Sequence, residues 1–129
     1  MTQEVPATPH FPGQAAIDSY GRGGFRFAGM SHRGSLLCLP SGIYVWDVST
    51  PEAISEAALA PVFAEADRIG ILMIGTGKSR WQLPVELLAL FGRYKISVET
   101  SRTGQAATTY NILLEEGRNV AAALIAVAD

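Results

Sequence analysis

The sequence predicts a single α/β domain of three layers, with a central, mostly parallel sheet, helices packed on it, and an N-terminal antiparallel β meander. The second half of the 129 residues alternates strand and helix patterns, which is typical of parallel strands joined by crossover helices. The first half instead carries short strand-like runs separated by turn residues. Apolar residues make up 48% of the chain and charged residues 17%, so the composition is that of a folded domain and excludes a disordered protein.

The domain is expected to occupy residues 15–129, after an N-terminal arm. Residues 1–14 are rich in proline and polar residues and show no periodicity, which predicts a mobile arm or a tail lying on the surface. The strand patterns that follow, at residues 25–27, 35–39 and 43–48, predict the meander.

Prolines and a threonine mark the expected helix starts in the rest of the chain. Pro51 stands where the first turn of a helix tolerates proline. Pro61 interrupts the helix that follows, so two short helical pieces, the second opened by Pro61, or a kink are expected. Thr103 is expected to cap the last helix, which Gly117 ends. The remaining elements are a strand, a helix, a strand, the last helix and a closing strand, at residues 69–74, 84–91, 96–100, 103–116 and 120–127. The first of these helices is expected to direct four apolar side chains to one face, Leu83, Leu87, Leu88 and Phe91.

Charge and composition limit the partners and the compartment. The net charge is −2 and the isoelectric point is about 5.6, which argues against a nucleic-acid partner. Cys38 is the single cysteine and no Cys/His set has the spacing of a zinc site, so no disulfide, metal or cofactor is expected. The first twelve residues lack the features of a signal peptide, and the longest apolar stretch, residues 120–128, is too short for a membrane span. A cytoplasmic location is therefore expected.

Gly75, Thr76, Gly77 and Lys78 follow a buried strand directly and form the first candidate site. Ligands of open α/β sheets sit beyond the carboxyl ends of the strands, and glycines let the backbone approach an anion closely. The segment is neither a Walker A sequence nor a complete dinucleotide fingerprint. Two interpretations stay open: a tight turn, or a site for an anion or nucleotide to which Lys78 adds charge.

Polar residues inside the last predicted helix form the second candidate site. Thr108, Thr109, Tyr110 and Asn111 include weak helix formers whose side chains compete for backbone hydrogen bonds. A run that breaks a local rule often marks function. Tyr110 shares the apolar face, so its ring is expected to pack and its hydroxyl to find a partner. The run is either structural or part of a polar pocket or interface.

The end of the same helix is the third candidate site. Glu115 and Glu116 place negative charge where the helix dipole opposes it, by about 0.3–1 kcal/mol each at exposed sites. Arg118 is expected to offset this charge. Glu115 is a candidate pocket residue and Arg118 a candidate binder of phosphate or carboxylate. The alternative is a solvated helix end.

No complete catalytic set is visible, so no catalytic residue is predicted and an enzymatic role is not favoured. Cys38 lies between two leucines in a strand, which predicts a buried, inert thiol. His32 lies beside a turn and is expected to be exposed, and nothing ties it or His10 to a nucleophile. Trp46 ends a strand just before a helix start, so it packs in the core or borders a pocket.

Three motifs follow one another in the chain. They are Gly34-Ser35-Leu36-Leu37 with Trp46-Asp47-Val48, then Ile74-Gly75-Thr76-Gly77, and last the run from Thr109-Tyr110-Asn111 to Ala122-Ala123-Leu124. Together they resemble the Mth-domain family, small proteins long classed as a domain of unknown function. The resemblance covers nearly the whole chain after about Ala16, and the last run is its most specific part.

The resemblance implies a compact α/β fold with an additional β layer, in a family without an established enzymatic activity. Its eukaryotic members include a mitochondrial assembly factor for respiratory complex I and an adipogenesis-associated protein. The site-lining positions that it implies are Trp46, Gly75, Thr76, Gly77, Thr109, Tyr110, Asn111 and Arg118. The chain departs from the family pattern at Gly70, where relatives often carry Asp, and at Ser101-Arg102, where Met-Asp is common. Both changes remove an acidic group near the pocket that the resemblance implies, which argues against a shared acid/base mechanism.

Two functions compete. The leading hypothesis is a non-enzymatic interaction protein with a protein partner, which assists assembly of a respiratory, complex I-type membrane complex and predicts an exposed apolar patch. The alternative is a small-molecule binding protein or enzyme acting on an anionic, nucleotide-like ligand at the 75–78 loop, which predicts that Gly77 and Arg118 converge on one site. A homo-oligomer held by strand pairing is a third possibility, and the sequence predicts no particular oligomeric state.

Overall fold

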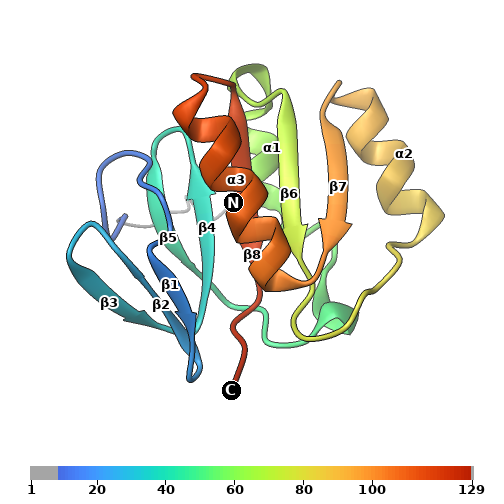
Figure 1. The fold of residues 1–129 in the computed structure, drawn as a ribbon. Helices are drawn as coiled ribbons and strands as arrows, with labels where there is room; N and C mark the ends of the chain where they lie inside the picture. The colour runs from blue at the N-terminus through green and yellow to red at the C-terminus, as the bar shows by residue number, and fades with distance from the viewer. Residues whose placement is uncertain (1–8, 129) are drawn as a thin grey trace, which may run out of the picture.

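A five-stranded sheet runs through the middle of the molecule in the computed structural model, which describes residues 9–128 (Figure 1). Its strands, in spatial order, are β5 (Gly42–Trp46), β4 (Ser35–Leu39), β8 (Val120–Leu124), β6 (Ile71–Gly75) and β7 (Ser97–Ser101). β6 is parallel to both of its neighbours, β7 and β8, as the alternation of strands and helices predicts. β4 is antiparallel to both β8 and β5, so the β4–β5 hairpin extends the parallel part and makes the sheet mixed.

A second, antiparallel sheet is formed by β1 (Ser19–Gly21), β2 (Gly24–Phe27) and β3 (Met30–Arg33). This is the expected N-terminal meander, but its strands differ from the prediction. Residues 35–39 and 43–48 were expected in the meander, and they contribute β4 and β5 to the central sheet instead. All five residues of β4 are buried, and a strand buried on both faces needs the cover that the middle of a layered sheet provides.

Two-residue loops connect the strands of the meander. Arg22 and Gly23 have φ angles of 54° and 79°, and Ala28 and Gly29 have φ angles of 50° and 74°. Positive φ at both positions is the requirement of the type I′ turn, whose twist suits a tight hairpin. Neither loop has the Asn-Gly or Asp-Gly sequence that signals such a turn, which is why β1 and β3 escaped prediction.

α3 (Thr103–Glu115) and the meander cover one face of the central sheet (Figure 1). Phe27 of the meander, Ala106 and Tyr110 of α3, and Met73 of β6 share one buried core on this side. Ala106 and Tyr110 therefore lie on the inward face of α3, as their spacing predicts. Gly117, with φ at 77°, follows the helix in the left-handed conformation that commonly ends helices.

Short helical pieces and one longer helix cover the opposite face. They are η1 (Pro51–Ala53), α1 (Ala60–Ala64), η2 (Ala66–Arg68) and α2 (Val85–Arg93). Pro51 and Pro61 lie in the first turns of η1 and α1, as predicted. α2 buries Leu87 and Phe91, whereas Leu88, expected on the same face, is 41% exposed. The three-layered α/β fold class is thereby confirmed. Within residues 9–128, no helix combines the length and apolar character that crossing a membrane requires.

The N-terminal segment, as far as the structure describes it, runs along the domain. The His10 amide donates to the Ile43 carbonyl (2.7 Å), and the Ile43 amide donates to the Phe11 carbonyl (3.0 Å). The Gln14 side chain donates from Nε2 to the Val120 carbonyl (2.7 Å). These bonds hold residues 9–14 of the expected arm against β5 and β8. Residues 1–8 of that arm lie outside the described residues.

Gly75 ends β6 where the strand lies against the start of α3, so a substitution there tests how tightly the two elements pack. A Cβ placed on Gly75 would lie 2.8 Å from the Thr103 Cα and 2.9 Å from its Oγ1. We expect Gly75→Ala to lower the free energy of unfolding by about 1–3 kcal/mol, because the backbone must shift to admit the methyl group.

Gly92→Ala is the control, since a Cβ at Gly92 meets nothing within 4 Å. It should stabilise α2 by about 0.5–1 kcal/mol. Urea unfolding measures both changes, and a Gly75→Ala variant as stable as the parent would contradict the close packing.

Candidate functional site

The loop after β6 is a junction at the carboxyl end of the parallel strands. The Thr76 amide donates to the carbonyl of Ser101, the last residue of β7 (2.9 Å). The amide of Ile125, just beyond β8, donates to the Gly75 carbonyl (3.0 Å). The Thr76 side chain is buried, and its hydroxyl donates to the Ser79 carbonyl within the same loop (2.7 Å). The loop therefore ties together the ends of β6, β7 and β8.

Thr103 connects this junction to α3. Its side chain is fully buried, and Oγ1 accepts the Gly77 amide (2.9 Å) and donates to the Ile125 carbonyl (2.7 Å). The Thr103 amide in turn donates to the Gly77 carbonyl (2.9 Å). The predicted role of Thr103 as the helix cap is wrong. Arg102 occupies the capping position without a side-chain bond, and the Thr103 hydroxyl serves the strand ends instead.

The backbone amides that would bind an anion in the 75–78 loop already have protein partners. The Thr76 amide is bonded to Ser101 and the Gly77 amide to Thr103. Gly77 has a φ of 93°, which favours glycine for conformational reasons alone. Lys78 lies exposed on the surface. The geometry therefore favours the tight-turn interpretation of this loop over the anion site.

The polar run in α3 holds the N-terminal segment to the helix. Asn111 donates from Nδ2 to the Ile17 carbonyl and accepts the Ile17 amide at Oδ1, both at 2.8 Å. The Tyr110 hydroxyl donates to the Ala15 carbonyl (3.0 Å). The preceding residue, Thr109, is half-buried. Tyr110 and Asn111 thus satisfy backbone groups that the segment entering β1 would otherwise leave without partners.

The Cys38 thiol lies against the Tyr110 hydroxyl in the core. Burial raises the pKa of the thiol to about 12, although the hydrogen bond between the thiol and Tyr110 opposes the shift. Burial also raises the pKa of Tyr110, and the neighbouring Cys38 adds to this. Both groups are therefore neutral at pH 7. The expected burial of Cys38 is confirmed, and its lack of reactivity stays a prediction.

Arg118 and Gly77 lie at opposite ends of the parallel strands. The register pairs Ile71 with Val120, so Arg118 comes just before the amino end of β8, whereas Gly77 comes just after the carboxyl end of β6. The five residues of β6 alone span about 13 Å at 3.3 Å per residue. The prediction that Gly77 and Arg118 converge on one site is therefore wrong. The cause is that α3 returns the chain from one end of the sheet to the other before Arg118.

The end of α3 is solvated. Arg118 Nη1 lies 4.0 Å from Glu116 Oε1, and about half of each side chain is exposed, so this ion pair offsets little free energy. Glu115 is exposed beside it. Arg118 also borders a shallow hollow of about 470 Å³ together with Glu99, so the two signs of charge are mixed there.

Trp46 lies in the core on the side of α1 and α2. It is 4% exposed, and its indole N–H donates to the Ala58 carbonyl (2.9 Å). The predicted site residues thus occupy four separate places: the junction after β6, the middle of α3, the end of α3 and the core around Trp46. Their part in binding a ligand or partner stays a prediction.

A pair of histidines was missed by the sequence reasoning. His32 was expected to be exposed, but it lies in β3 and is 7% exposed. Its Nδ1 lies 3.2 Å from Nδ1 of His10, and its Nε2 lies 3.3 Å from the Ser35 carbonyl oxygen. Burial lowers the pKa of His32, the hydrogen bond to Ser35 partly offsets this, and His10 lowers it further. Within the part of the chain that the structure describes, no three His, Cys, Asp or Glu side chains are grouped to hold a metal ion.

Comparison with known proteins places the chain beside relatives whose sequences cover most of it. The model of a family described as a protein of unknown function (DUF498/DUF598) matches residues 17–125. An uncharacterised protein of Rhodobacter capsulatus is 37% identical over 121 residues, which cover 94% of this chain and 92% of the relative. The mouse NADH dehydrogenase (ubiquinone) 1 alpha subcomplex assembly factor 3 is 34% identical over 115 residues, which cover 89% of this chain. The chain spans only 62% of that assembly factor.

Solved structures share the fold. A crystal structure described as an outer membrane protein from Bartonella henselae has 52% sequence identity and a TM-score of 0.88, covering 92% of this chain and 99% of that one. A solution structure of a Bordetella pertussis protein, described as an Mth938-like domain, has a TM-score of 0.76 at 23% identity. It covers 95% of this chain and 92% of that one. This chain therefore shares its fold with proteins that are between 23% and 52% identical to it.

The buried His32 should make the stability of the protein depend on pH. Its pKa is lowered in the folded state from the ordinary value of 6.5, so the unfolded chain binds more protons below that pH. We expect the free energy of unfolding to be constant above pH 6.5 as far as His32 is concerned, and to fall as the pH drops towards the folded pKa. His32→Gln should flatten this part of the profile, whereas Arg93→Gln should not. Urea midpoints measured over this range test it, and an equal slope in His32→Gln and the parent would exclude His32 as the cause.

Proposed function

The chain belongs to the DUF498/DUF598 family of proteins of unknown function, the Mth-domain family that its motifs resemble, and we propose that it binds a protein partner during assembly of a complex I-type respiratory complex. The names of the animal relatives support this role, since they are assembly factors of NADH dehydrogenase. The surface of α2 carries the proposal, because it has an apolar side that nothing in the described chain covers.

α2 is apolar on two sides. Leu87 and Phe91 face the core and are 6% and 1% exposed. Val85 is 77% exposed and Leu88 is 41% exposed, and a spacing of three puts them on one outward side of the helix. The outward side of α2 therefore offers apolar surface that a partner can bury.

Small residues extend this outward side. Ala89 and Gly92 are exposed and follow Val85 and Leu88 at the spacing of one helix face. A Cβ on Gly92 would meet no atom within 4 Å, so this end of the helix is open to a close approach. Together these four residues form the outer face of α2. Val85 and Leu88 carry large apolar side chains, and Ala89 and Gly92 leave the other half of the face without projecting side chains. Exposed apolar patches of this kind are typical of protein-binding surfaces.

The alternative function, an anionic ligand at the 75–78 loop, has less support. It requires free amides at Thr76 and Gly77, and both amides are hydrogen-bonded within the protein. It also requires Arg118 nearby, which lies at the other end of the sheet. The protein-partner proposal is the one that the exposed residues favour.

Deletion of the gene, in an organism that carries both this chain and a complex I-type enzyme, tests the proposal. We expect the membranes to lose NADH:ubiquinone oxidoreductase activity and the fully assembled complex on native gels. The parent chain should restore both. A Val85→Lys/Leu88→Lys variant should fold and yet fail to restore them, because two charges on the outer face of α2 cannot be buried at an interface without a large cost.

Glu86→Lys is the matched control, since Glu86 is exposed on the same helix between the two substituted positions. It should restore the activity. A normal complex in the deletion strain would contradict the assembly role. Full restoration by the double lysine variant would contradict the use of the outer face of α2.

A further inference from the structure

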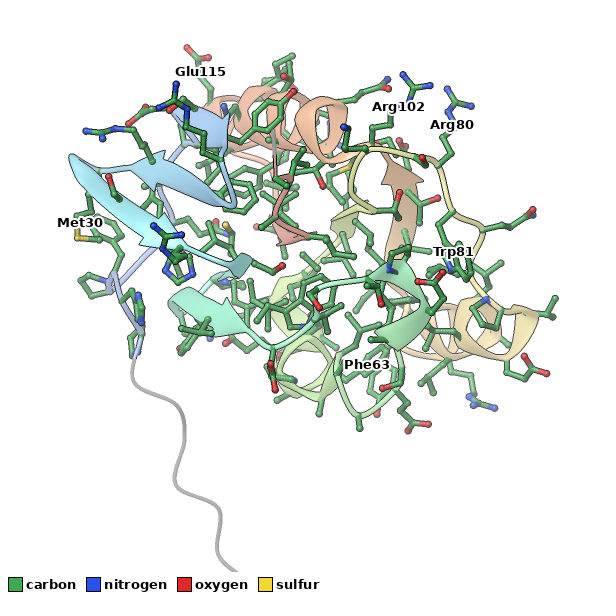
Figure 2. All side chains as sticks on the ribbon, turned by 90° about the horizontal axis from the view of Figure 1, so that it is seen from below. Met30, Phe63, Arg80, Trp81, Arg102 and Glu115 are labelled. Atoms are coloured by element: carbon green, nitrogen blue, oxygen red, sulfur yellow. The ribbon has the colours of Figure 1, made fainter. Side chains whose placement is uncertain are left out.

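A hollow of about 700 Å³ lies at the meander. Its lining comes from β1, β2 and β3 and from Arg22 in the loop between β1 and β2, and it includes the buried Phe25 and His32 beside exposed residues. Figure 2 shows side chains that end in nitrogen atoms over these strands, on the far side of the molecule from the labelled Trp81. The hollow is therefore separate from the outer face of α2 and from the junction after β6.

The hollow exists because several residues on one face of the strands have small side chains or none. The register pairs Ser19 with Arg26, Gly21 with Gly24, and Arg26 with Ser31. Residues paired directly across antiparallel strands share a face, and so do alternate residues along each strand. Two glycines and two serines thus make the floor, and the serine side chains, Ser19 and Ser31, are exposed there.

Three arginines surround this floor. Arg22 lies in the β1–β2 loop, Arg26 in β2 and Arg33 in β3, and all three are exposed. Arg33 pairs with Gly24 and Arg26 with Ser31, which makes the two arginines diagonal neighbours at about 7–8 Å. Arg26 Nη1 donates to Ser31 Oγ (3.0 Å), so its guanidinium is already directed across the floor.

The positive charge of the hollow is not neutralised within the described chain. The residues that line it include no Asp or Glu. Among residues 9–128, the ion pairs within 4.0 Å are those of Arg68 with Glu65 and of Arg118 with Glu116. A chain with a net charge of −2 therefore gathers three guanidinium groups in one place without carboxylates. Neighbouring like charges repel each other, so an anion bound between them gains their combined attraction.

We propose that this hollow binds the phosphate group of a phosphorylated ligand, with Arg26 and Arg33 as the main contacts and Arg22 at the border. Guanidinium groups match phosphate oxygens with paired hydrogen bonds, and serine hydroxyls add further donors. The volume is in the range of small-molecule sites, which suits a phosphorylated metabolite or the headgroup of a phospholipid. A nucleic-acid track would need a longer basic surface than one hollow on an acidic chain.

The test is a titration of the intact, isotope-labelled protein with pyrophosphate at physiological ionic strength, followed by amide chemical shifts. We expect the shifts to change in β1, β2 and β3. Arg26→Gln and Arg33→Gln should each weaken binding by at least about tenfold, because each removes charge-assisted hydrogen bonds. Arg93→Gln, an exposed arginine at the end of α2, is the control and should leave the affinity unchanged.

A second arm separates the two sources of phosphate. The protein is sedimented with vesicles of phosphatidylglycerol and, as the reference, of phosphatidylcholine. Binding of pyrophosphate that depends on Arg26 and Arg33 supports a soluble ligand. Sedimentation with phosphatidylglycerol alone, lost in the same variants, supports a lipid headgroup. The proposal is overturned if neither probe binds, or if Arg26→Gln and Arg33→Gln bind as the parent does. Neither arm involves Val85 or Leu88, so its failure is distinct from a failure of the assembly role.

Discussion

The buried hydroxyl of Thr103 is the interaction on which the rest of the structure depends. It accepts the Gly77 amide and donates to the Ile125 carbonyl, so one oxygen atom joins the start of α3 to the chain leaving β6 and the chain leaving β8. The absence of a side chain at Gly75 is what lets α3 come this close. Buried polar groups are stable only when hydrogen-bonded, and the turn after β6, with its positive φ at Gly77, supplies the partner. The end of the sheet where α/β proteins commonly bind ligands is consequently filled by the protein's own backbone contacts.

Local patterns predicted most of the helices and strands, with β1 and β3 as exceptions, but they predicted the pairing of the strands poorly. The crossover half from β6 to β8 followed from periodicity, and the helical pieces at Pro51 and Pro61 followed from the geometry of proline. The sheet to which Ser35–Leu39 belongs depends on pairing with β8, more than eighty residues later, and no local pattern contains that information. Thr103 looks the same in sequence whether it caps a helix or bonds two strand ends. To predict that Gly77 and Arg118 lie apart, one likewise needs to know the direction in which α3 runs along the sheet.

Among the residues that the structure describes, the outer face of α2 and the hollow on the meander both lack internal partners, and they differ in chemistry. The outer face of α2 is apolar, and the hollow on the meander is lined by arginines and short residues. Figure 1 places α2 beside β7 and the meander beside β4 and β5, at opposite ends of the sheet. A protein partner on α2 therefore leaves the meander accessible. Sequence patterns had pointed to the junction and to α3 instead, because glycine turns and polar helical residues are conspicuous there. In α3, the side chains of Tyr110 and Asn111 are hydrogen-bonded to backbone groups of Ala15 and Ile17.

The most direct test of the Thr103 junction is native-state hydrogen exchange at the Gly77 amide, in the parent and in Thr103→Val, which keeps the shape of the side chain and removes its hydroxyl. If the hydroxyl holds the junction closed, the Gly77 amide of the parent exchanges as slowly as the amides of β6, and the substitution speeds its exchange by a factor of ten or more, since a lost buried hydrogen bond costs about 1–3 kcal/mol. A Gly77 amide that exchanges in the parent at the rate of an open loop would contradict this account and make that end of the sheet available to a ligand.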